Sequence, residues 1–259
     1  MISKSQQKYI RSLEHKKYRR KEGVFVAEGV KTVGDLMMVI PVKEIYATHE
    51  WMTTHTAQIP HEAIVHEITD AELERLSFQQ HPQQVLALFP LPDPAVPSNL
   101  ITGEIKDKTL VLALDGVQDP GNLGTIIRIA DWFGINTIIC STDTADAYNP
   151  KVIQATMGSI ARTNIIYTDL LSFIDQLPHD YPIYGTLLDG QDIYQQQITP
   201  YGLIIMGNEG RGISAPIAER VNHRLLIPNF PEGRPTADSL NVAIATAITC
   251  AEFRRIAKL

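Results

Sequence analysis

Short apolar runs alternate with helical patterns through the second half of the chain. The runs predicted as strands are 110–114, 137–140, 164–167, 183–187, 203–206 and 224–227. Helical periodicity falls at 122–133, 150–159, 169–177, 214–221 and 239–257. Strands that are apolar throughout and joined by helices predict a parallel sheet covered on both faces. We therefore expect an α/β fold for this half of the chain.

The first 90 residues predict a smaller α/β unit. Its expected strands are 24–27, 44–48, 63–68 and 84–89. Its expected helices are 3–21, 30–39 and 71–76, the last with Asp70 as its N-cap. Four of the 16 prolines then lie within residues 90–97, and such a segment forms a semi-rigid spacer. We therefore predict domains at 1–90 and 108–259, separated by a linker at 91–107.

The final predicted helix has no polar face through its first turns. Its small and apolar residues are Val242, Ala243, Ile244, Ala245, Ala247, Ile248 and Ala251. A helix that is apolar all round must be buried by something. The sheet can cover one side, and a second subunit is the simplest cover for the other. The pattern therefore favours a dimer.

Charge is distributed unevenly along the chain of 259 residues, whose net charge is −6. Residues 1–31 hold nine Lys and Arg against three Glu, so they carry +6 and leave −12 for the remainder. A basic stripe on an acidic body can still bind phosphates, because salt confines the interaction to about 10 Å. The alternative is a solvated helix face.

Composition excludes several other classes of protein. Cys140 and Cys250 are the only cysteines and form no C-x-x-C pair, so neither a zinc ribbon nor a disulfide scaffold is expected. His49, His55, His61 and His66 lack a convincing ligand spacing, so no metal is predicted. The N-terminus has no apolar signal core, and no apolar run is long enough to span a bilayer. A cytoplasmic protein is the natural expectation.

The first candidate motif is Asp119-Pro120-Gly121-Asn122, which follows a predicted strand and opens a helix. A turn with Asp119 or Asn122 as helix cap explains all of it. Arg128 is less easily explained, because it lies among apolar residues of that helix. An ion pair with Asp131 is the structural interpretation of Arg128.

The second motif runs from Met206 through Gly207, Glu209 and Gly210 to Gly212. It fits neither the dinucleotide-binding pattern nor a P-loop, so nucleotide hydrolysis is not expected. Its glycines permit positive φ and close approach of a ligand to the backbone. A glycine loop at the end of a strand is where open α/β sheets bind ligands. A tight turn before the next helix explains the loop equally well when it is taken alone.

The third segment joins Ile227-Pro228, at the end of a strand, to Ser239-Leu240-Asn241 at the start of the apolar helix. Asp238 or Ser239 as N-cap is the structural interpretation. Asn241 lies inside the expected first turn and is not explained in that way.

Together the three segments resemble the three motifs of the SpoU/TrmH family, the knotted RNA ribose methyltransferases that use S-adenosylmethionine. The resemblance covers roughly the last 150 residues in content and order. The first domain is similar to the family's L30e-like substrate-binding domain through Leu13, Lys16, Arg19, Phe25, Glu28 and Gly29. The fold implied is a parallel-sheet SPOUT methyltransferase domain with a C-terminal trefoil knot, preceded by the small α/β domain. A homodimer formed through the C-terminal domain is implied as well.

The resemblance also assigns residues. Those implied to contact S-adenosylmethionine are Thr186, Leu187, Met206, Gly207, Gly210, Ile227 and Leu240. Those implied to line the site of methyl transfer are Asn122, Arg128, Glu209, Ser239 and Asn241. We predict that Lys16, Lys17, Arg19, Arg20, Lys21 and Arg128 bind RNA. Arginine holds its proton too tightly to be a good general base, so Arg128 is expected to fix a phosphate and stabilise the developing alkoxide.

One departure from the family pattern is the link 229–238, which is longer and richer in proline than the family's usual connection. Its place beside the expected site predicts a lid or an RNA contact through Arg234.

The leading prediction is an RNA 2′-O-methyltransferase acting on ribosomal RNA. The alternatives are a transfer RNA methyltransferase, a non-catalytic RNA-binding or assembly module of the same fold, and a methyltransferase acting on a base or a small molecule. The intact motif residues disfavour the non-catalytic module. The motif set disfavours a base as the acceptor, and the basic first helix disfavours a small molecule.

Overall fold

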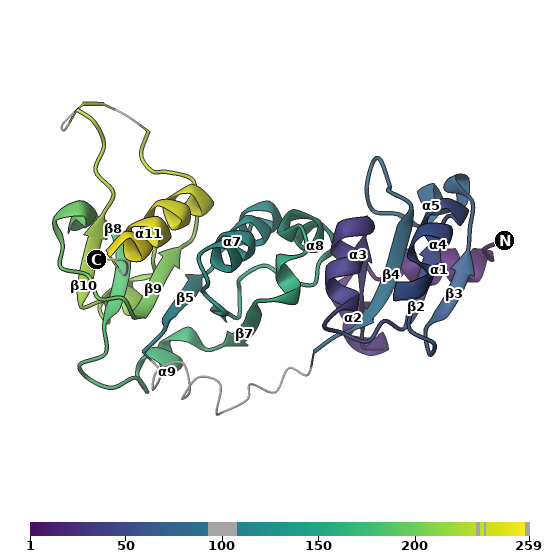
Figure 1. Cartoon of the computed structure of the whole chain (residues 1–259). Helices are drawn as coiled ribbons and strands as arrows, with labels where there is room; N and C mark the ends of the chain where they lie inside the picture. Colours follow the sequence, from purple (N-terminus) through teal and green to yellow (C-terminus); the bar gives the residue numbers. More distant parts are fainter. Residues whose placement is uncertain (93–107, 232–233, 236, 257–259) are drawn as a thin grey trace. The chain divides into compact units, whose positions relative to one another are not determined.

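A computed structural model describes residues 1–92, 108–231, 234–235 and 237–256. The chain divides into two compact units, each described here by itself (Figure 1). The first contains Met1–Asp93 and Asp146–Ala161, and the second contains Pro94–Ala145 and Arg162–Leu259. Most of the predicted linker 91–107 lies outside the described residues.

The first unit is a four-stranded sheet with short helices. Its helices are α1 (Lys4–Ser12), α2 (Lys16–Glu22), α3 (Val30–Met37), α4 (His49–His55), the 3₁₀ turn η1 (Thr56–Gln58) and α5 (Asp70–Leu76). Its strands are β1 (Val24–Glu28), β2 (Glu44–Ala47), β3 (Ile64–Glu67) and β4 (Val85–Pro90), in the order β1-β4-β2-β3. Strand β4 is antiparallel to β1 and β2, and β2 is parallel to β3.

The predicted helices of this unit differ from the observed ones in three places. The single helix expected at 3–21 is divided into α1 and α2, because the chain turns at the buried residue Leu13. The N-cap of α5 is Thr69 rather than Asp70, and it forms a capping box with Glu72. Helix α4 was not predicted, since its seven residues carry too little apolar periodicity.

Glu28 is the buried polar anchor of the first unit. Its carboxylate accepts hydrogen bonds from the Ser77 hydroxyl and, at 2.9 Å, from the Phe78 backbone N–H. Burial raises the pKa of Glu28, although both hydrogen bonds act in the opposite direction. The carboxylate therefore holds the turn after α5 against the end of β1.

A segment from the middle of the chain completes the first unit. It contains α8 (Pro150–Thr156) and the 3₁₀ turn η2 (Ser159–Ala161), and α8 packs on β1. Tyr148 lies against Phe25 with ring centroids 5.0 Å apart. Gly158 has a φ of +91°, and a Cβ there would lie 2.4 Å from Asp35 Oδ2. This segment falls within the range 108–259 of the predicted second domain, yet it packs with the first unit.

The second unit is a six-stranded sheet whose neighbouring strands are all parallel, which confirms the predicted architecture. Its strands are β5 (Leu110–Asp115), β6 (Thr137–Ser141), β7 (Asn164–Thr168), β8 (Ile183–Asp192), β9 (Gly202–Gly207) and β10 (His223–Leu226). Their order is β10-β8-β9-β5-β6-β7. Its helices are α7 (Pro120–Trp132), α9 (Leu170–Ile174), η3 (Ile193–Gln195), α10 (Ala215–Ala218) and α11 (Val242–Ile256).

Helices α7 and α11 pack together, and the hydrogen bonds at their two ends show that they run in the same direction. At their amino ends Asn241 donates to Asn122, at 2.9 Å. At their carboxyl ends Arg254 donates to the carbonyls of Phe133, at 2.6 Å, and Gly134, at 2.9 Å. A cation at this position also complements the dipole of α7. The helix pair therefore starts at the carboxyl edge of the sheet, where α7 follows β5.

Strand β8 separates from β10 in its middle and then pairs with it again. Gly185 pairs with Arg224 of β10, but the next paired residues are Gln191 and Leu225, so residues 186–190 bulge away from β10. Gly190 allows the chain to return, because a Cβ there would lie 2.5 Å from the backbone of Leu225. The bulge widens the carboxyl edge of the sheet beside β9.

Candidate functional site

The carboxylate of Glu209 joins the loop after β9 to the loop after β5. It accepts hydrogen bonds from the backbone N–H of Gln118, at 3.4 Å, and of Asp119, at 3.3 Å. It also accepts one from Asn122 Nδ2 at 3.1 Å, across 87 residues of sequence. Two of the predicted site residues, Asn122 and Glu209, are thus in direct contact. Glu209 also provides hydrogen-bond acceptors for backbone N–H groups at the start of α7.

Asn241 brings the third motif to the same place. Its Nδ2 donates to Asn122 Oδ1 at 2.9 Å, and its Oδ1 accepts from the N–H groups of Ala243 and Ile244. Asn241 is therefore the N-cap of α11, which begins at Val242 rather than at the predicted residue 239. The expectation that Asp238 or Ser239 caps this helix is wrong, because Asn241 fills that role.

The turn that leads into α7 is fixed by Asp119. Its side chain caps the helix by accepting from Asn122 N–H at 2.7 Å, and Pro120 occupies the first turn. The structural interpretation of Asp119 is thus confirmed. The cap uses only the backbone N–H of Asn122. The side-chain amide of Asn122 instead forms hydrogen bonds with Glu209 and Asn241.

The loop after β9 is closed tightly on itself. Asn208 and Gly212 exchange two backbone hydrogen bonds of 2.9 Å. A Cβ on Gly207 would lie 2.2 Å from the backbone of Gly212 and Ile213, so only glycine fits. A Cβ on Gly210 would meet nothing nearer than Asn208 Oδ1, at 3.7 Å. The surface above Gly210 is therefore open to a ligand.

Arg128 lies on the exposed side of α7. Its predicted structural partner, Asp131, forms a bidentate ion pair with Arg162, with a shortest distance of 2.7 Å. Among the residues that the structure describes, none forms a hydrogen bond or ion pair with the Arg128 side chain. The guanidinium is therefore available to an anionic ligand. Ser239 is exposed in the link before α11, and within the described part of the chain it forms no hydrogen bond with Glu209, Asn122 or Asn241.

The residues expected to hold the cofactor come from neighbouring strand ends. Thr186 opens the β8 bulge, and its hydroxyl lies 3.7 Å from the sulfur of Met206 on β9. Leu187 is half-buried, and Leu240 is 51% exposed. Ile227 directly follows β10, the neighbour of β8. Apolar side chains and open backbone at such an edge suit a nucleoside, whose ring is apolar and whose edge forms hydrogen bonds. The residues present therefore fit an adenosyl group.

Five of the six residues predicted to bind RNA lie on α2, and four of these five are exposed. Lys16, Lys17, Arg20 and Lys21 are all exposed there.

Arg19 is different, and the prediction that it contacts RNA is wrong. It is 1% exposed, donates to the carbonyls of Leu13 and Glu14 at 2.7 Å each, and pairs with Asp146. Its guanidinium is therefore occupied in joining α2 to the segment that begins at Asp146.

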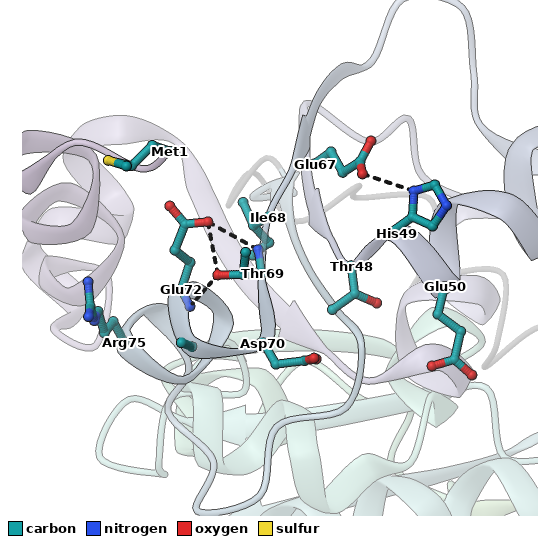
Figure 2. A pocket seen from close by; sticks show the side chains of 11 residues that line it. Met1, Thr48, His49, Glu50, Glu67, Ile68, Thr69, Asp70, Glu72 and Arg75 are labelled. Carbon is teal, nitrogen blue, oxygen red and sulfur yellow. Dashed lines mark hydrogen bonds and ion pairs between the residues drawn. The ribbon is translucent and has the colours of Figure 1, made fainter.

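The first unit also has a cavity of about 710 Å³ that contains none of the predicted site residues (Figure 2). It lies where the parallel strands β2 and β3 end and α4 and α5 begin. Figure 2 shows its carboxylates, of which Glu67 contacts His49 at 3.0 Å and Glu72 forms the capping box of α5 with Thr69. Its lining combines four carboxylates with Arg75 and the N-terminal residue Met1.

Other chemistries find no support in the part of the chain that the structure describes. It contains no group of three or more His, Cys, Asp or Glu side chains able to hold a metal ion. None of its helices is long and apolar enough to cross a membrane. Cys140 and Cys250 are buried, and burial raises the pKa of both thiols, that of Cys250 to about 12. Both thiols therefore stay protonated near neutral pH and are poor nucleophiles.

Asn208 was not among the predicted site residues, although it lies within the second motif. Its Nδ2 donates to the carbonyl of Gly116 at 2.6 Å. An asparagine inside a glycine-rich loop gave no signal, because its partner lies 92 residues away.

A parallel sheet with polar side chains gathered at its carboxyl edge defines an α/β protein with its ligand site at the strand ends. Comparison with known proteins gives the family. Residues 109–251 match the SpoU rRNA Methylase family, and residues 4–87 match the MRM3-like substrate binding domain. The chain belongs to the SpoU rRNA Methylase family.

Relatives of known name or structure cover nearly the whole chain. The chain is 32% identical over 248 residues to the 23S rRNA (guanosine(2553)-2′-O)-methyltransferase RlmP of Bacillus subtilis, and the match covers 94% of each protein. A putative RNA methyltransferase of the TrmH family from Porphyromonas gingivalis has 38% identity and a TM-score of 0.83, with 99% of each chain covered. An AdoMet-bound rRNA methyltransferase from Sinorhizobium meliloti has 30% identity and a TM-score of 0.85, with 99% of this chain and 97% of that chain covered.

Proposed function

We propose that this protein transfers a methyl group from S-adenosylmethionine to a ribose 2′-hydroxyl of ribosomal RNA. The observation that carries the proposal is the hydrogen-bonded cluster of Glu209, Asn122 and Asn241, which unites the three motifs at the carboxyl edge of the sheet. Family membership and the ribosomal RNA named for the relatives support the substrate class.

The cofactor is proposed to lie between the β8 bulge, the loop after β9 and the start of the link after β10. The residues proposed to hold it are Thr186, Leu187, Met206, Gly207, Gly210, Ile227 and Leu240. When bound, it would supply a methyl carbon on a positively charged sulfur, and that carbon would accept the nucleophile as the sulfur leaves with the electrons of the carbon–sulfur bond. The chain's own residues bind it, exclude water and orient the ribose.

Arg128 is the proposed anion-binding residue of the transfer site. A guanidinium presents several N–H donors to a phosphate and keeps its charge, but it does not accept a proton. Arg128 would therefore fix the phosphate beside the target ribose and stabilise negative charge on the attacking 2′-oxygen. Its exposure, and the lack of an ion partner among the described residues, support this role.

The other site residues are proposed to set the geometry around that oxygen. Glu209 orients Asn122, and Asn122 is held on its other side by Asn241. Ser239 offers a hydroxyl close in sequence to Asn241. With both ends of the Asn122 amide engaged, one orientation of its donor and acceptor is favoured.

Lys16, Lys17, Arg20 and Lys21 on α2 are the proposed phosphate contacts of the first unit. None of these four residues lines the cavity of Figure 2. We propose 1–90 as the RNA-binding domain, 91–107 as a linker and 108–259 as the methyltransferase domain.

A homodimer through α7 and α11 is also proposed. Trp132 on α7 is 84% exposed and Ile244 on α11 is 53% exposed. Large apolar side chains exposed on a packed helix pair indicate an interface, and a second copy of the chain would cover them. A trefoil knot at the C-terminal stretch and a cytoplasmic location complete the proposal.

The test supplies labelled S-adenosylmethionine with unmodified ribosomal or transfer RNA and measures label retained in each RNA. Cofactor binding is measured separately by calorimetry. Label in ribosomal RNA is expected. Label only in transfer RNA would change the substrate, and cofactor binding without transfer to either pool would contradict the proposed substrate class. Failure to bind the cofactor would favour a non-catalytic RNA-binding module.

A further inference from the structure

The backbone of Gly116 is held on both sides at the start of the turn into α7. Its N–H donates to Ser141 Oγ at 2.8 Å, and its carbonyl accepts from Asn208 Nδ2 at 2.6 Å. Gly116 has a φ of +71°, a conformation that favours glycine. Ser141 ends β6 and Asn208 directly follows β9, the two strands that flank β5, so these two side chains fix where the turn begins.

The other end of the Asn208 amide serves its own loop. Its Oδ1 accepts from the backbone N–H of Gly210 at 2.9 Å and of Arg211 at 3.0 Å. One side chain therefore has two separable functions. Its oxygen shapes the loop after β9, and its nitrogen joins that loop to the turn after β5.

The two segments joined in this way carry the groups of the transfer site. Glu209 directly follows Asn208, and its carboxylate receives the N–H groups of Gln118 and Asp119 from the turn. A shift of the turn relative to the loop would stretch these bonds and the bond from Asn122 Nδ2 to Glu209. A small misplacement of this kind is costly for a reaction that depends on orientation.

We propose that Asn208 is a positioning residue for methyl transfer. The bond from its Nδ2 to Gly116 holds the turn, and through it Asn122, in register with Glu209. The inference rests on the proposed function. It assigns Asn208 no contact with substrate or cofactor.

The chemistry of the amide provides a variant that separates its two functions. Asn208→Asp keeps an oxygen that accepts from Gly210 and Arg211, but it cannot donate to the Gly116 carbonyl and faces it with an oxygen instead. Asn208→Ala loses both functions. Ser141→Ala removes the partner of the Gly116 N–H, and it tests the turn without altering the loop after β9.

Asn222 offers a matched control at the opposite end of the sheet. Its Nδ2 donates to the Tyr181 carbonyl at 2.9 Å, and its Oδ1 accepts from the N–H of Ile183 at 2.8 Å. This is the same two-sided bridge, but it lies at the amino end of β8. Asn222→Asp therefore reproduces the structural cost of Asn208→Asp away from the site.

The experiment measures kcat with ribosomal RNA, the Kd of S-adenosylmethionine by calorimetry, and Tm for each variant. Asn208→Asp and Ser141→Ala should lower kcat about tenfold, the effect of one hydrogen bond, while the cofactor Kd stays near that of the wild type. Asn222→Asp should lower Tm by about as much as Asn208→Asp does and should leave kcat unchanged. Asn208→Ala should lower kcat and weaken cofactor binding as well.

Equal kcat values for Asn208→Asp, Ser141→Ala and Asn222→Asp would overturn the proposal. So would a loss of cofactor affinity that matches the loss of kcat in Asn208→Asp. If Asn208→Asp does not fold, Ser141→Ala decides by the same criterion. Absence of transfer by the wild-type protein would overturn the proposed function itself, and the wild-type control distinguishes the two failures.

Discussion

Asn241 Nδ2 donates to Asn122 Oδ1 at 2.9 Å, joining the amino ends of two helices that are 119 residues apart in sequence. The same Asn241 side chain caps α11 through its oxygen. The residue that starts the last helix thus also orients the amide that faces Glu209. Helix capping and the proposed site geometry therefore depend on opposite ends of one amide group.

This double role predicts that stability and activity can be separated at Asn241. Asn241→Ala should lower the free energy of unfolding by about 1 kcal/mol, the usual value of an N-cap, and should also reduce methyl transfer. Asn241→Asp keeps the capping oxygen but loses the donor to Asn122, so it should restore stability and not activity. Denaturant unfolding and transfer rates measure both. Full activity in Asn241→Asp would show that the contact with Asn122 is dispensable.

Neighbouring arginines on α2 should behave in opposite ways. Arg19→Ala leaves the Asp146 carboxylate without its buried partner, so it should cost about 3 kcal/mol of stability. Arg20 is exposed, so Arg20→Ala should leave Tm unchanged and reduce the salt dependence of RNA binding by about one phosphate contact. Thermal unfolding and RNA binding at several salt concentrations test the pair. A stable Arg19→Ala protein with weakened RNA binding would return Arg19 to the RNA-binding group.

Two glycines of the loop after β9 should also differ. Gly207→Ala places a methyl group 2.2 Å from the backbone of Gly212 and Ile213, so it should prevent proper folding of the loop and lower Tm. Gly210→Ala meets open space, so the protein should fold normally. Its added methyl group would occupy the surface proposed for the cofactor and should weaken cofactor binding in calorimetry. Wild-type affinity in Gly210→Ala would place the cofactor elsewhere.

The proposed dimer predicts a response at Trp132. Trp132→Glu introduces a charge on the exposed face of α7 and should convert the dimer to a monomer in sedimentation experiments. Met38, which is 76% exposed in the first unit, provides a control of the same kind. Met38→Glu should leave the oligomeric state unchanged. A wild-type monomer, or a Trp132→Glu dimer, would contradict the proposed interface.

The parallel sheet could be predicted from the sequence because its strands are uniformly apolar and lie between helical patterns. The segment around Tyr148 could not be placed, since periodicity identifies a helix but not the sheet against which it packs. The N-cap of α11 was misplaced for a related reason. Ser239 and Asp238 cap helices as well as Asn241 does, and the choice is made by a tertiary contact with Asn122.

For the site as well, local sequence patterns identified residues but not the long-range contacts between them. Asn122, Glu209 and Asn241 were named through the resemblance to a family, and their mutual hydrogen bonds became visible only in three dimensions. Arg19 was grouped with its basic neighbours because charge is visible in a sequence and burial is not. Its partner Asp146 lies 127 residues away and carries no local signal of that pairing.

The central claim is that methyl transfer to a ribose 2′-oxygen depends on Arg128 at this edge of the sheet. The most direct measurement compares wild-type protein with Arg128→Ala, using labelled S-adenosylmethionine and ribosomal RNA, followed by nuclease digestion and identification of the labelled nucleoside. We predict a 2′-O-methyl nucleoside from the wild type, and no transfer by Arg128→Ala despite cofactor binding near the wild-type level. Label on a base, or transfer by Arg128→Ala near the wild-type rate, would contradict the account.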